Sequence, residues 1–478
     1  MGVKNKVIAN MAWKFAERIT AQFVTAIVSI ILARILSPTH YGLVAIVEIF
    51  ITFANVFVSD GFGSALIQKK DADSLDFCSV LYFNISFSVL LYILLYLIAP
   101  SISRFYGAGY EEITPVLRVL GLRLILSAIN SVQQAYVSKH MIFRKFFWAT
   151  LLGTVCSAVV GITMAYKGYG VWALVFQYLT NTTVDTFVLN RSLKLKPKLM
   201  FSFVRLKGML KYGSGILLAK LLITGYQELR ALIIGKMYSS SELAYYEKGR
   251  QFPKLIVTNI DSSLGAVLFP KMSIEQSNLQ RIKETTRNSI RFSSFVMCPL
   301  MLGLAAISDS FVKLILTEKW IACVPFMRMF CVIFLFQPIH TANMQAIKAI
   351  GRSDIYLRLE LLKKGIELLT LILAAQISVD AIVINMAILT TLFTFINSFP
   401  NRKLLNYSFK EQMQDILPNI ITSGIMFLLV FFLGKINVNY IIKMVLQILA
   451  GGIFYFFAAY ITKNNELKYL VKLLKNKA

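Results

Sequence analysis

Apolar runs of about twenty residues recur along the whole chain, and their length limits what the chain can fold into. An α-helix rises about 1.5 Å per residue, so such a run crosses the roughly 30 Å hydrocarbon core of a bilayer. Of the 478 residues, 57% are hydrophobic and only 15% are charged, whereas roughly a quarter are charged in an ordinary soluble domain. The sequence therefore predicts an all-α integral membrane protein.

The charged breaks between the apolar runs divide the chain into fourteen predicted transmembrane segments. They cover residues 13–36, 43–67, 79–99, 113–137, 147–166, 170–189, 212–235, 243–270, 289–307, 322–347, 356–376, 381–400, 415–434 and 439–461.

Lys and Arg are distributed unequally between the two sides of these segments. With the N-terminus placed in the cytoplasm, the inner segments carry 34 Lys and Arg and the outer loops carry 6. Because cytoplasmic loops favour Lys and Arg, we expect both termini in the cytoplasm. The net charge of +26 is explained by this distribution, and no RNA-binding motif or zinc spacing supports nucleic-acid binding.

The five cysteines are scattered and lie in or beside apolar runs, without a CxxC pair. They are Cys78, Cys156, Cys298, Cys323 and Cys331. This pattern predicts small buried hydrophobic side chains and neither a disulfide framework nor a metal site.

The chain contains an internal repeat of six segments. ILARILSPTHYG, at the end of the first segment and in its loop, resembles LIIGKMYSSSELAYY at the end of the seventh. The pairs Gln134–Ala135 and Gln345–Ala346 occupy corresponding positions in the fourth and tenth. An even number of spans gives a parallel repeat, which is typical of transporters. The predicted organisation, given by residue range, is an N-lobe (1–190), a cytoplasmic amphipathic linker (191–211), a C-lobe (212–400), two further segments (401–462) and a basic tail (463–478).

Polar side chains follow one helical face in several segments. Lys14, Arg18 and Gln22 are spaced i, i+4 and i+8 in the first. A charge near the bilayer centre costs roughly 2.5–3.5 kcal/mol on insertion scales, so it usually faces a bundle interior or a water-filled cavity. Segments 1, 2, 4, 7, 8 and 10 carry such stripes, which predicts one central cavity between the lobes. The alternative is that small polar residues only cement helix packing, while Lys14 extends to the headgroups.

The stripes supply two sets of candidate site residues. The cations, which suit an anionic group such as a diphosphate, are accompanied by one amide; the set is Lys14, Arg18, Gln22, Arg123, Lys220, Arg250 and Lys254. The acids suit coupling to H⁺ or Na⁺, and they are Glu48, Asp60, Glu228, Glu247 and Asp261. No other cofactor and no metal are expected. Segments 13 and 14 carry no stripe beyond Lys443, so we expect them to be peripheral and to face lipid.

Eight short motifs, in order along residues 8–400, resemble those of bacterial polysaccharide flippases of the Wzx type. This family belongs to the multidrug/oligosaccharidyl-lipid/polysaccharide exporter superfamily. The motifs are ARILSPTHYGLVA, DGFGSALIQKKD, APSISRFYG, LRVLGLRLILSA, GYGVWALV, VLFPKMS, EKWIACVPFMRMF and QAIKAIGRSD.

The resemblance implies two six-helix lobes arranged in a V, with two extra C-terminal helices. It implies a bacterial inner-membrane protein that moves an undecaprenyl-diphosphate-linked oligosaccharide between leaflets by alternating access, for lipopolysaccharide O-antigen or exopolysaccharide synthesis. An ion gradient would supply the energy, because the chain has no P-loop. We expect a monomer, with a polysaccharide polymerase and chain-length proteins as partners. Arg18 and Gln22 fall where the family presents a polar helix face, whereas Arg230 replaces an Asp of relatives.

Two other functions fit a chain of this kind. A membrane glycan polymerase or ligase would place its charged residues in large outer loops, but the longest outer loops span only 100–112 and 308–321. His40, His140 and His340 are far apart in the sequence, so no catalytic cluster is predicted and we expect no enzyme. A multidrug exporter of the same fold would require a cavity dominated by carboxylates, and the excess of cations argues against it.

Overall fold

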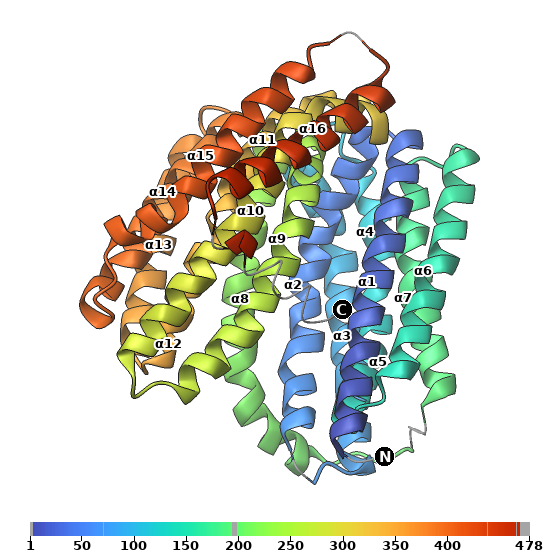
Figure 1. Ribbon diagram of the computed structural model, residues 1–478. Coiled ribbons are helices and arrows are strands. Elements are labelled where there is room, and N and C mark those ends of the chain that lie inside the picture. Colours follow the sequence, from blue (N-terminus) through green and yellow to red (C-terminus); the bar gives the residue numbers. More distant parts are fainter. Residues whose placement is uncertain (1–2, 70, 194–197, 437, 465, 469–478) are drawn as a thin grey trace. The chain divides into compact units, whose positions relative to one another are not determined.

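The computed structural model describes residues 3–69, 71–193, 198–436, 438–464 and 466–468, which are almost entirely α-helical and contain no strand (Figure 1). The helices are α1 (Val3–Ile35), α2 (Pro38–Gln68), α3 (Ser74–Tyr106), α4 (Ile113–Leu120), α5 (Arg123–His140), α6 (Phe143–Tyr166), α7 (Val171–Ser192), α8 (Phe203–Met237), α9 (Ser240–Ile274), α10 (Leu279–Ile315), the 3₁₀-helix η1 (Glu318–Cys323), α11 (Val324–Leu335), α12 (Gln337–Ala349), α13 (Ser353–Ala374), α14 (Val379–Leu404), α15 (Phe409–Leu433) and α16 (Tyr440–Ile461).

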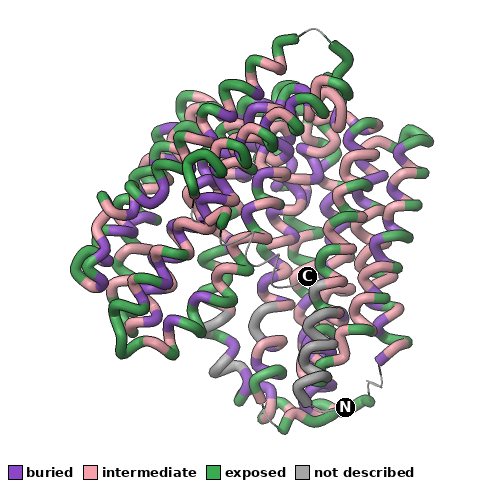
Figure 2. Tube along the Cα trace, in the orientation of Figure 1, coloured by how far each residue is buried: buried purple, intermediate pink, exposed green. Residues whose placement is uncertain are grey.

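Each predicted transmembrane segment coincides with a helix, or with a run of consecutive helices, in the described part of the chain. Ten of them are long and apolar enough to cross a membrane. The remaining four are α7, α8, α9 and α13, which are also at least 22 residues long but richer in polar and charged residues. An all-α integral membrane fold is therefore confirmed. Large apolar side chains such as Ile453 and Phe457 of α16 are exposed, as expected for a surface in contact with lipid. Exposed residues recur along the helices (Figure 2).

Side-chain caps fix where several helices begin. The Ser37 hydroxyl accepts a hydrogen bond from the His40 backbone N–H ahead of α2, which has Pro38 in its first turn. The α3 and α15 starts each carry a capping box, in which a polar residue at the N-cap and an acid three residues later satisfy each other's backbone N–H. Asp73 and Asp76 form the first box.

The chain divides into two compact units, Met1–Ala244 and Tyr245–Ala478. The first unit holds α1–α8 together with the first residues of α9. Within it, α8 lies along α2, where a Cβ added at Gly235 would be 3.1 Å from Ile46. The predicted boundaries between N-lobe, linker and C-lobe stay a prediction, as does the central cavity.

The segment that leads into α8 is attached to α3 rather than free. The Tyr82 hydroxyl donates to the Lys198 carbonyl at 3.0 Å, and the Ser202 backbone N–H donates to the Ser79 hydroxyl at 2.9 Å. Leu206 and Met209 are buried in a cluster with residues of α2, α3 and α5. Because α8 already begins at Phe203, the second half of the predicted amphipathic linker is continuous with the seventh segment. Residues 194–197 and the tail 469–478 lie outside the described residues.

Ion pairs reinforce this attachment at the loop between α2 and α3. The Asp76 carboxylate has no exposed side-chain surface, and both its oxygens accept hydrogen bonds from the Lys69 ammonium at 2.6 Å. Arg205 of α8 donates to Asp73 at 2.7 Å. That hydrogen bond is the main reason that the pKa of Asp73 falls to about 2. The loop and the start of α8 are therefore held by charge as well as by apolar contact.

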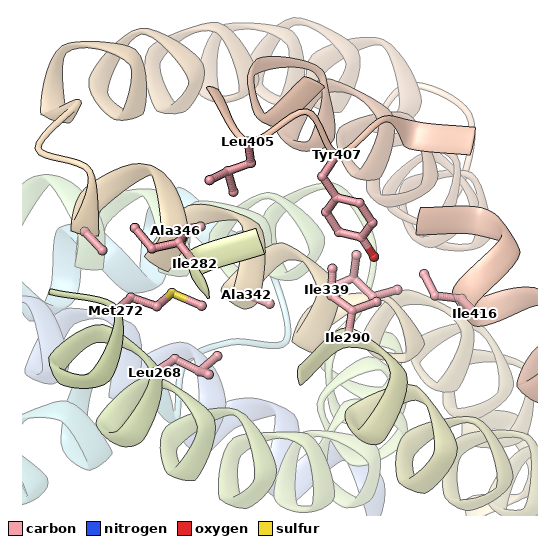
Figure 3. Close-up of a cluster of buried hydrophobic side chains, with 11 residues drawn as sticks. Leu268, Met272, Ile282, Ile290, Ile339, Ala342, Ala346, Leu405, Tyr407 and Ile416 are labelled. Carbon is pink, nitrogen blue, oxygen red and sulfur yellow. The ribbon is translucent and has the colours of Figure 1, made fainter. Parts of the chain in front are cut away.

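The second unit contains a cluster of buried apolar side chains that come from α9, α10, α12, α15 and the loop between α14 and α15 (Figure 3). Leu268 and Met272 of α9 pack there with Ile339 of α12 and Ile416 of α15. Tyr407, from the loop between α14 and α15, lies beside them and is fully buried. This cluster joins α15 and the loop before it to α9, α10 and α12.

Contrary to the expectation that segments 13 and 14 are peripheral, α15 has a buried polar face. Gln412, Asp415, Asn419 and Ser423 lie on it at helical spacing and are all buried. The Asn419 amide donates to the Ser294 hydroxyl of α10 at 2.8 Å. These hydrogen bonds hold α15 against α10, while α16 exposes apolar side chains.

Candidate functional site

The fourth transmembrane segment is broken into two helices, and a charged residue begins the second. α4 ends at Leu120 and α5 starts at Arg123. The tenth segment is broken in the same way, between α11 and α12 at Phe336. These are the two segments that share the Gln-Ala pair, so the breaks support the six-segment repeat.

Arg123 joins three helices of the first unit. Its Nη1 donates to Glu48 Oε1 of α2 at 2.8 Å, and its Nε donates to Thr182 Oγ1 of α7 at 3.2 Å. The guanidinium also lies over the ring of Tyr178, 5.4 Å from its centroid. The ion pair is half-buried, with 31% of the Arg123 side chain and 25% of the Glu48 side chain exposed. We call Glu48, Arg123, Tyr178 and Thr182 the arginine site.

A second group of polar contacts joins α5 and α7 two turns further along α5. The Asn130 amide donates to Asp185 Oδ2 at 2.9 Å, and Gln133 donates to the Thr186 carbonyl at 3.3 Å. The other Asp185 oxygen is buried without a hydrogen-bond partner among the described residues. Glu17 of α1 interacts electrostatically with Asp185 and Lys14. Asp185 is thus an acid of the polar interior that was not among the predicted site residues.

The predicted cations of α1 and α8 are more exposed. Lys14 and Arg18 are exposed and Gln22 is half-buried. The Lys14 ammonium lies over the rings of Phe143 and Phe146 of α6, at 5.1 and 5.8 Å. Its role in binding and the alternative, extension to the headgroups, both stay predictions.

In α8, Lys220 is exposed and Glu228 is half-buried. Arg230 donates to the Tyr226 hydroxyl at 3.2 Å and lies over its ring. The Asp60 side chain lies outside the described residues.

The second unit repeats the combination of an arginine, a glutamate and a tyrosine. Arg250 donates to Glu247 at 2.7 Å, one turn away on α9, and lies over the ring of Tyr246. Lys254 is exposed. Asp261, further along α9, accepts a hydrogen bond from the Thr341 hydroxyl of α12. The structure therefore places the predicted acids in two different settings: Glu247 neutralises a cation, whereas Asp261 is bound by a neutral group.

Buried amides between α12 and α14 were not predicted. Asn397 donates to His340 at 2.8 Å, and Asn401 donates to the Asn343 side chain at 2.7 Å. They occupy the same pair of segments, the fourth and sixth of the repeat, that Asn130 and Asp185 join in the first unit. The helical spacing of Thr390, Thr394, Asn397 and Asn401 in the twelfth segment was the available signal.

The arrangement suits binding and release of charged groups. Among the described residues, no group of three or more His, Cys, Asp or Glu could hold a metal ion. The geometry offers two paired charges within these helices, in which Arg123 and Arg250 each lie over a tyrosine ring and form an ion pair with one glutamate. Such sites can exchange one anion for another without covalent chemistry.

The fold and these polar interiors define a multi-span membrane protein built from two helical units, with charged side chains inside its spans. The family model described as "Polysaccharide biosynthesis protein" matches residues 31–325. The chain belongs to this family of polysaccharide biosynthesis proteins.

Two curated relatives and one solved structure illustrate the similarity. The teichuronic acid biosynthesis protein TuaB of Bacillus subtilis (strain 168) is 23% identical over 358 residues, which cover 74% of this chain and 73% of that protein. The lipopolysaccharide biosynthesis protein WzxC of Escherichia coli (strain K12) is 19% identical over 387 residues, covering 79% and 77%. A structure of the lipid II flippase MurJ, in an inward closed conformation, has the same fold, with a TM-score of 0.75, 16% identity and coverage of 95% of this chain and 98% of that chain.

Proposed function

We propose that this protein moves a lipid-linked oligosaccharide, carried on undecaprenyl diphosphate, from the inner to the outer leaflet of the bacterial inner membrane. Membership of the polysaccharide biosynthesis family carries the proposal. The names of TuaB and WzxC, which place those proteins in the synthesis of cell-surface glycans, and the flippase fold support it. The oligosaccharide would then serve the assembly of a surface polysaccharide.

The chemistry of the cargo suits the charges of the spans. A diphosphate carries the negative charge that has to pass the hydrocarbon core, and Arg and Lys are the side chains that bind phosphate. We propose that the cargo contacts come from Arg123 and Arg250, together with Lys14, Arg18, Gln22, Lys220 and Lys254. Alternating access would expose these residues first to one side of the membrane and then to the other.

Coupling to H⁺ or Na⁺ would supply the energy. The proposed carriers are Glu48, Asp60, Glu228, Glu247 and Asp261. Asp261 is the one that we favour among the acids with described side chains, because its bound partner is the neutral Thr341. Glu48 and Glu247 are each held by an arginine.

The protein would act as a non-enzymatic carrier with cytoplasmic termini, as a monomer beside a polysaccharide polymerase and chain-length proteins. Deleting the gene tests the proposed function. Undecaprenyl-diphosphate oligosaccharide is expected to accumulate on the inner leaflet and the surface glycan to disappear. Unchanged lipid intermediates with increased drug sensitivity would instead indicate a multidrug exporter. If the protein were instead a glycan polymerase or ligase, its deletion would leave unpolymerised or unligated lipid-linked glycan on the outer leaflet.

Variants test the cargo contacts. Arg18→Ala and Arg250→Ala are expected to abolish export of the glycan while the protein remains in the membrane. Arg352→Ala, which removes an exposed cation paired with Asp354 outside the predicted spans, is the matched control. Full export by both Arg18→Ala and Arg250→Ala would reject the cationic contacts.

A further inference from the structure

We propose that Glu48 is a built-in substitute for the cargo's diphosphate at Arg123, which it neutralises in the empty carrier and releases when the cargo binds. The inference rests on the proposed function and concerns how the same site exchanges its ligand. It joins two residues for which we predicted separate roles, Arg123 in cargo binding and Glu48 in ion coupling.

The first observation is that Arg123 is held in place without Glu48. Thr182 accepts from its Nε at 3.2 Å, and Tyr178 supports the face of the guanidinium. The Thr182 hydroxyl donates to the Tyr178 carbonyl at 3.2 Å, so its oxygen is turned toward Arg123 as an acceptor. Both contacts come from one turn of α7. The guanidinium can therefore keep its position when the carboxylate leaves.

The second observation is that Glu48 reaches Arg123 from a different helix and through a single close contact. Glu48 lies on α2, and its Oε1 accepts from Nη1 at 2.8 Å. An arginine–carboxylate pair is strongest when two parallel N–H groups contact both oxygens. Here the hydrogen bond joins only Nη1 to Oε1, so the pair is single and not bidentate. The contact neutralises the charge without the added strength of a bidentate pair.

The third observation is that the Glu48–Arg123 pair lies within a transmembrane segment and is partly exposed. Arg123 begins α5 within the fourth transmembrane segment, where an unneutralised cation is costly. Yet about a quarter to a third of each side chain is exposed, 25% for Glu48 and 31% for Arg123. A charge pair exposed at this depth can be reached by a ligand. A diphosphate, with more charge and more acceptor oxygens than a carboxylate, can displace Glu48 from Arg123.

Competition by Glu48 for Arg123 moderates the affinity of the carrier for its cargo. A carrier must bind its cargo strongly enough to accept it and weakly enough to release it. Because Glu48 competes for Arg123, it lowers the affinity for diphosphate and returns to the arginine as the cargo leaves. The pair Glu247 and Arg250, which also has a tyrosine under the guanidinium, has the same composition in the second unit.

Binding of farnesyl diphosphate to the full chain in phosphatidylcholine nanodiscs tests the inference, with farnesol as the probe that lacks phosphate. Glu48→Gln keeps the size of the side chain and removes its charge. We expect it to bind farnesyl diphosphate about tenfold more tightly, because a competing charge within 3 Å is lost. Arg123→Gln is expected to lose the binding, and the double variant to behave like Arg123→Gln alone. Asp354→Asn, at an exposed pair in the second unit, is the control and should bind like the wild type.

In cells, Glu48→Gln should export less glycan although it binds more tightly, because release becomes slower. Unchanged or weaker binding by Glu48→Gln would overturn the inference. If Arg123→Gln fails to reach the membrane, Arg123→Lys, which keeps the charge, replaces it in the comparison with Glu48→Gln. Glycan export by a wild type that does not bind farnesyl diphosphate would also overturn it, while leaving the proposed function in place. A gene deletion without effect on the glycan would reject the proposed function itself, whatever the binding result.

Discussion

Arg287 of α10 and Asp415 of α15 form a two-pronged ion pair, in which Nε and Nη2 each donate to one carboxylate oxygen at 2.8 Å. Asp415 is nearly enclosed, with 5% of its side chain exposed, whereas 43% of the Arg287 side chain is exposed. Tyr407 also donates to Asp415, at 2.9 Å. The pair fixes the thirteenth segment against the ninth, in the same way as Asn419 and Ser294 one turn away.

We expect Arg287→Ala to destabilise the second unit by about 1–2 kcal/mol. The buried Asp415 carboxylate loses its counter-charge and keeps only the Tyr407 hydroxyl, and the exposure of Arg287 reduces the effect through solvent screening. Thermal unfolding in detergent measures it. Arg352→Ala, at a pair in which both side chains are 47% exposed, should change the stability by less than about 0.5 kcal/mol. Equal effects of the two variants would show that the Arg287 pair contributes no more than a surface contact.

The helices could be predicted well because their signal is local, and ten of those that the structure describes are long and apolar enough to cross a membrane. A run of apolar residues long enough to cross the bilayer has few alternatives to a helix, so all fourteen predicted segments coincide with helices of the described chain. The breaks at Gly121–Leu122 and at Phe336 were missed because the apolar pattern continues through them. Only Pro338, in the first turn of α12, marks the second break in the sequence.

The candidate site could be predicted only in part, because the contacts of Arg123 with Glu48 and Thr182 join residues far apart in the chain. Glu48 and Arg123 were both candidates, but nothing in the sequence shows that residues 75 positions apart are in contact. The polar face of α15 was missed for another reason. Its buried members include the neutral residues Gln412, Asn419 and Ser423, and a search guided by charge gives such residues little weight.

The stabilisation that the Asp73–Arg205 contact gives to the attachment of α8 should change with pH only under acidic conditions. Hydrogen bonding to Arg205 lowers the pKa of Asp73 from 3.8 to about 2. A lowered pKa in the folded state means that the stabilisation is fully present above pH 4 and is lost as the pH falls toward 2. Comparing the melting temperatures of wild type and Asp73→Asn measures it. The difference should be constant from pH 7 to 5 and shrink below 4, and a difference that changes between pH 7 and 5 would contradict it.

The proposed orientation can be tested by labelling engineered cysteines in intact cells. Cys156 is the exposed cysteine among the five, and the other four are buried, so Cys156→Ser provides the background. Ala108→Cys lies in the loop after α3 and Ser277→Cys in the loop between α9 and α10, and both positions are exposed. With the termini in the cytoplasm, a membrane-impermeant maleimide applied from outside should label position 108 and not position 277. The reverse pattern would show that the orientation is opposite to the predicted one. Opening the cells should allow labelling of both positions.

Close packing of α9 leaves no room for a side chain at Gly249. A Cβ added there would lie 2.7 Å from the Phe326 Cβ, 2.9 Å from the Cys323 carbonyl oxygen and 2.9 Å from the Met327 nitrogen. Two of these atoms belong to the backbone, which cannot move aside cheaply. We therefore expect Gly249→Ala to destabilise the second unit by about 1–3 kcal/mol through overpacking.

Gly365 of α13 provides the matched comparison. It also lies inside a helix of the second unit, but a Cβ added there meets no atom within 4 Å. Gly365→Ala should be neutral or stabilise the helix by up to about 1 kcal/mol, because Ala has the higher helix propensity. Thermal unfolding of the two variants side by side separates packing from propensity. A loss of stability at Gly249 that is no larger than at Gly365 would mean that α9 is not packed this closely against the start of α11.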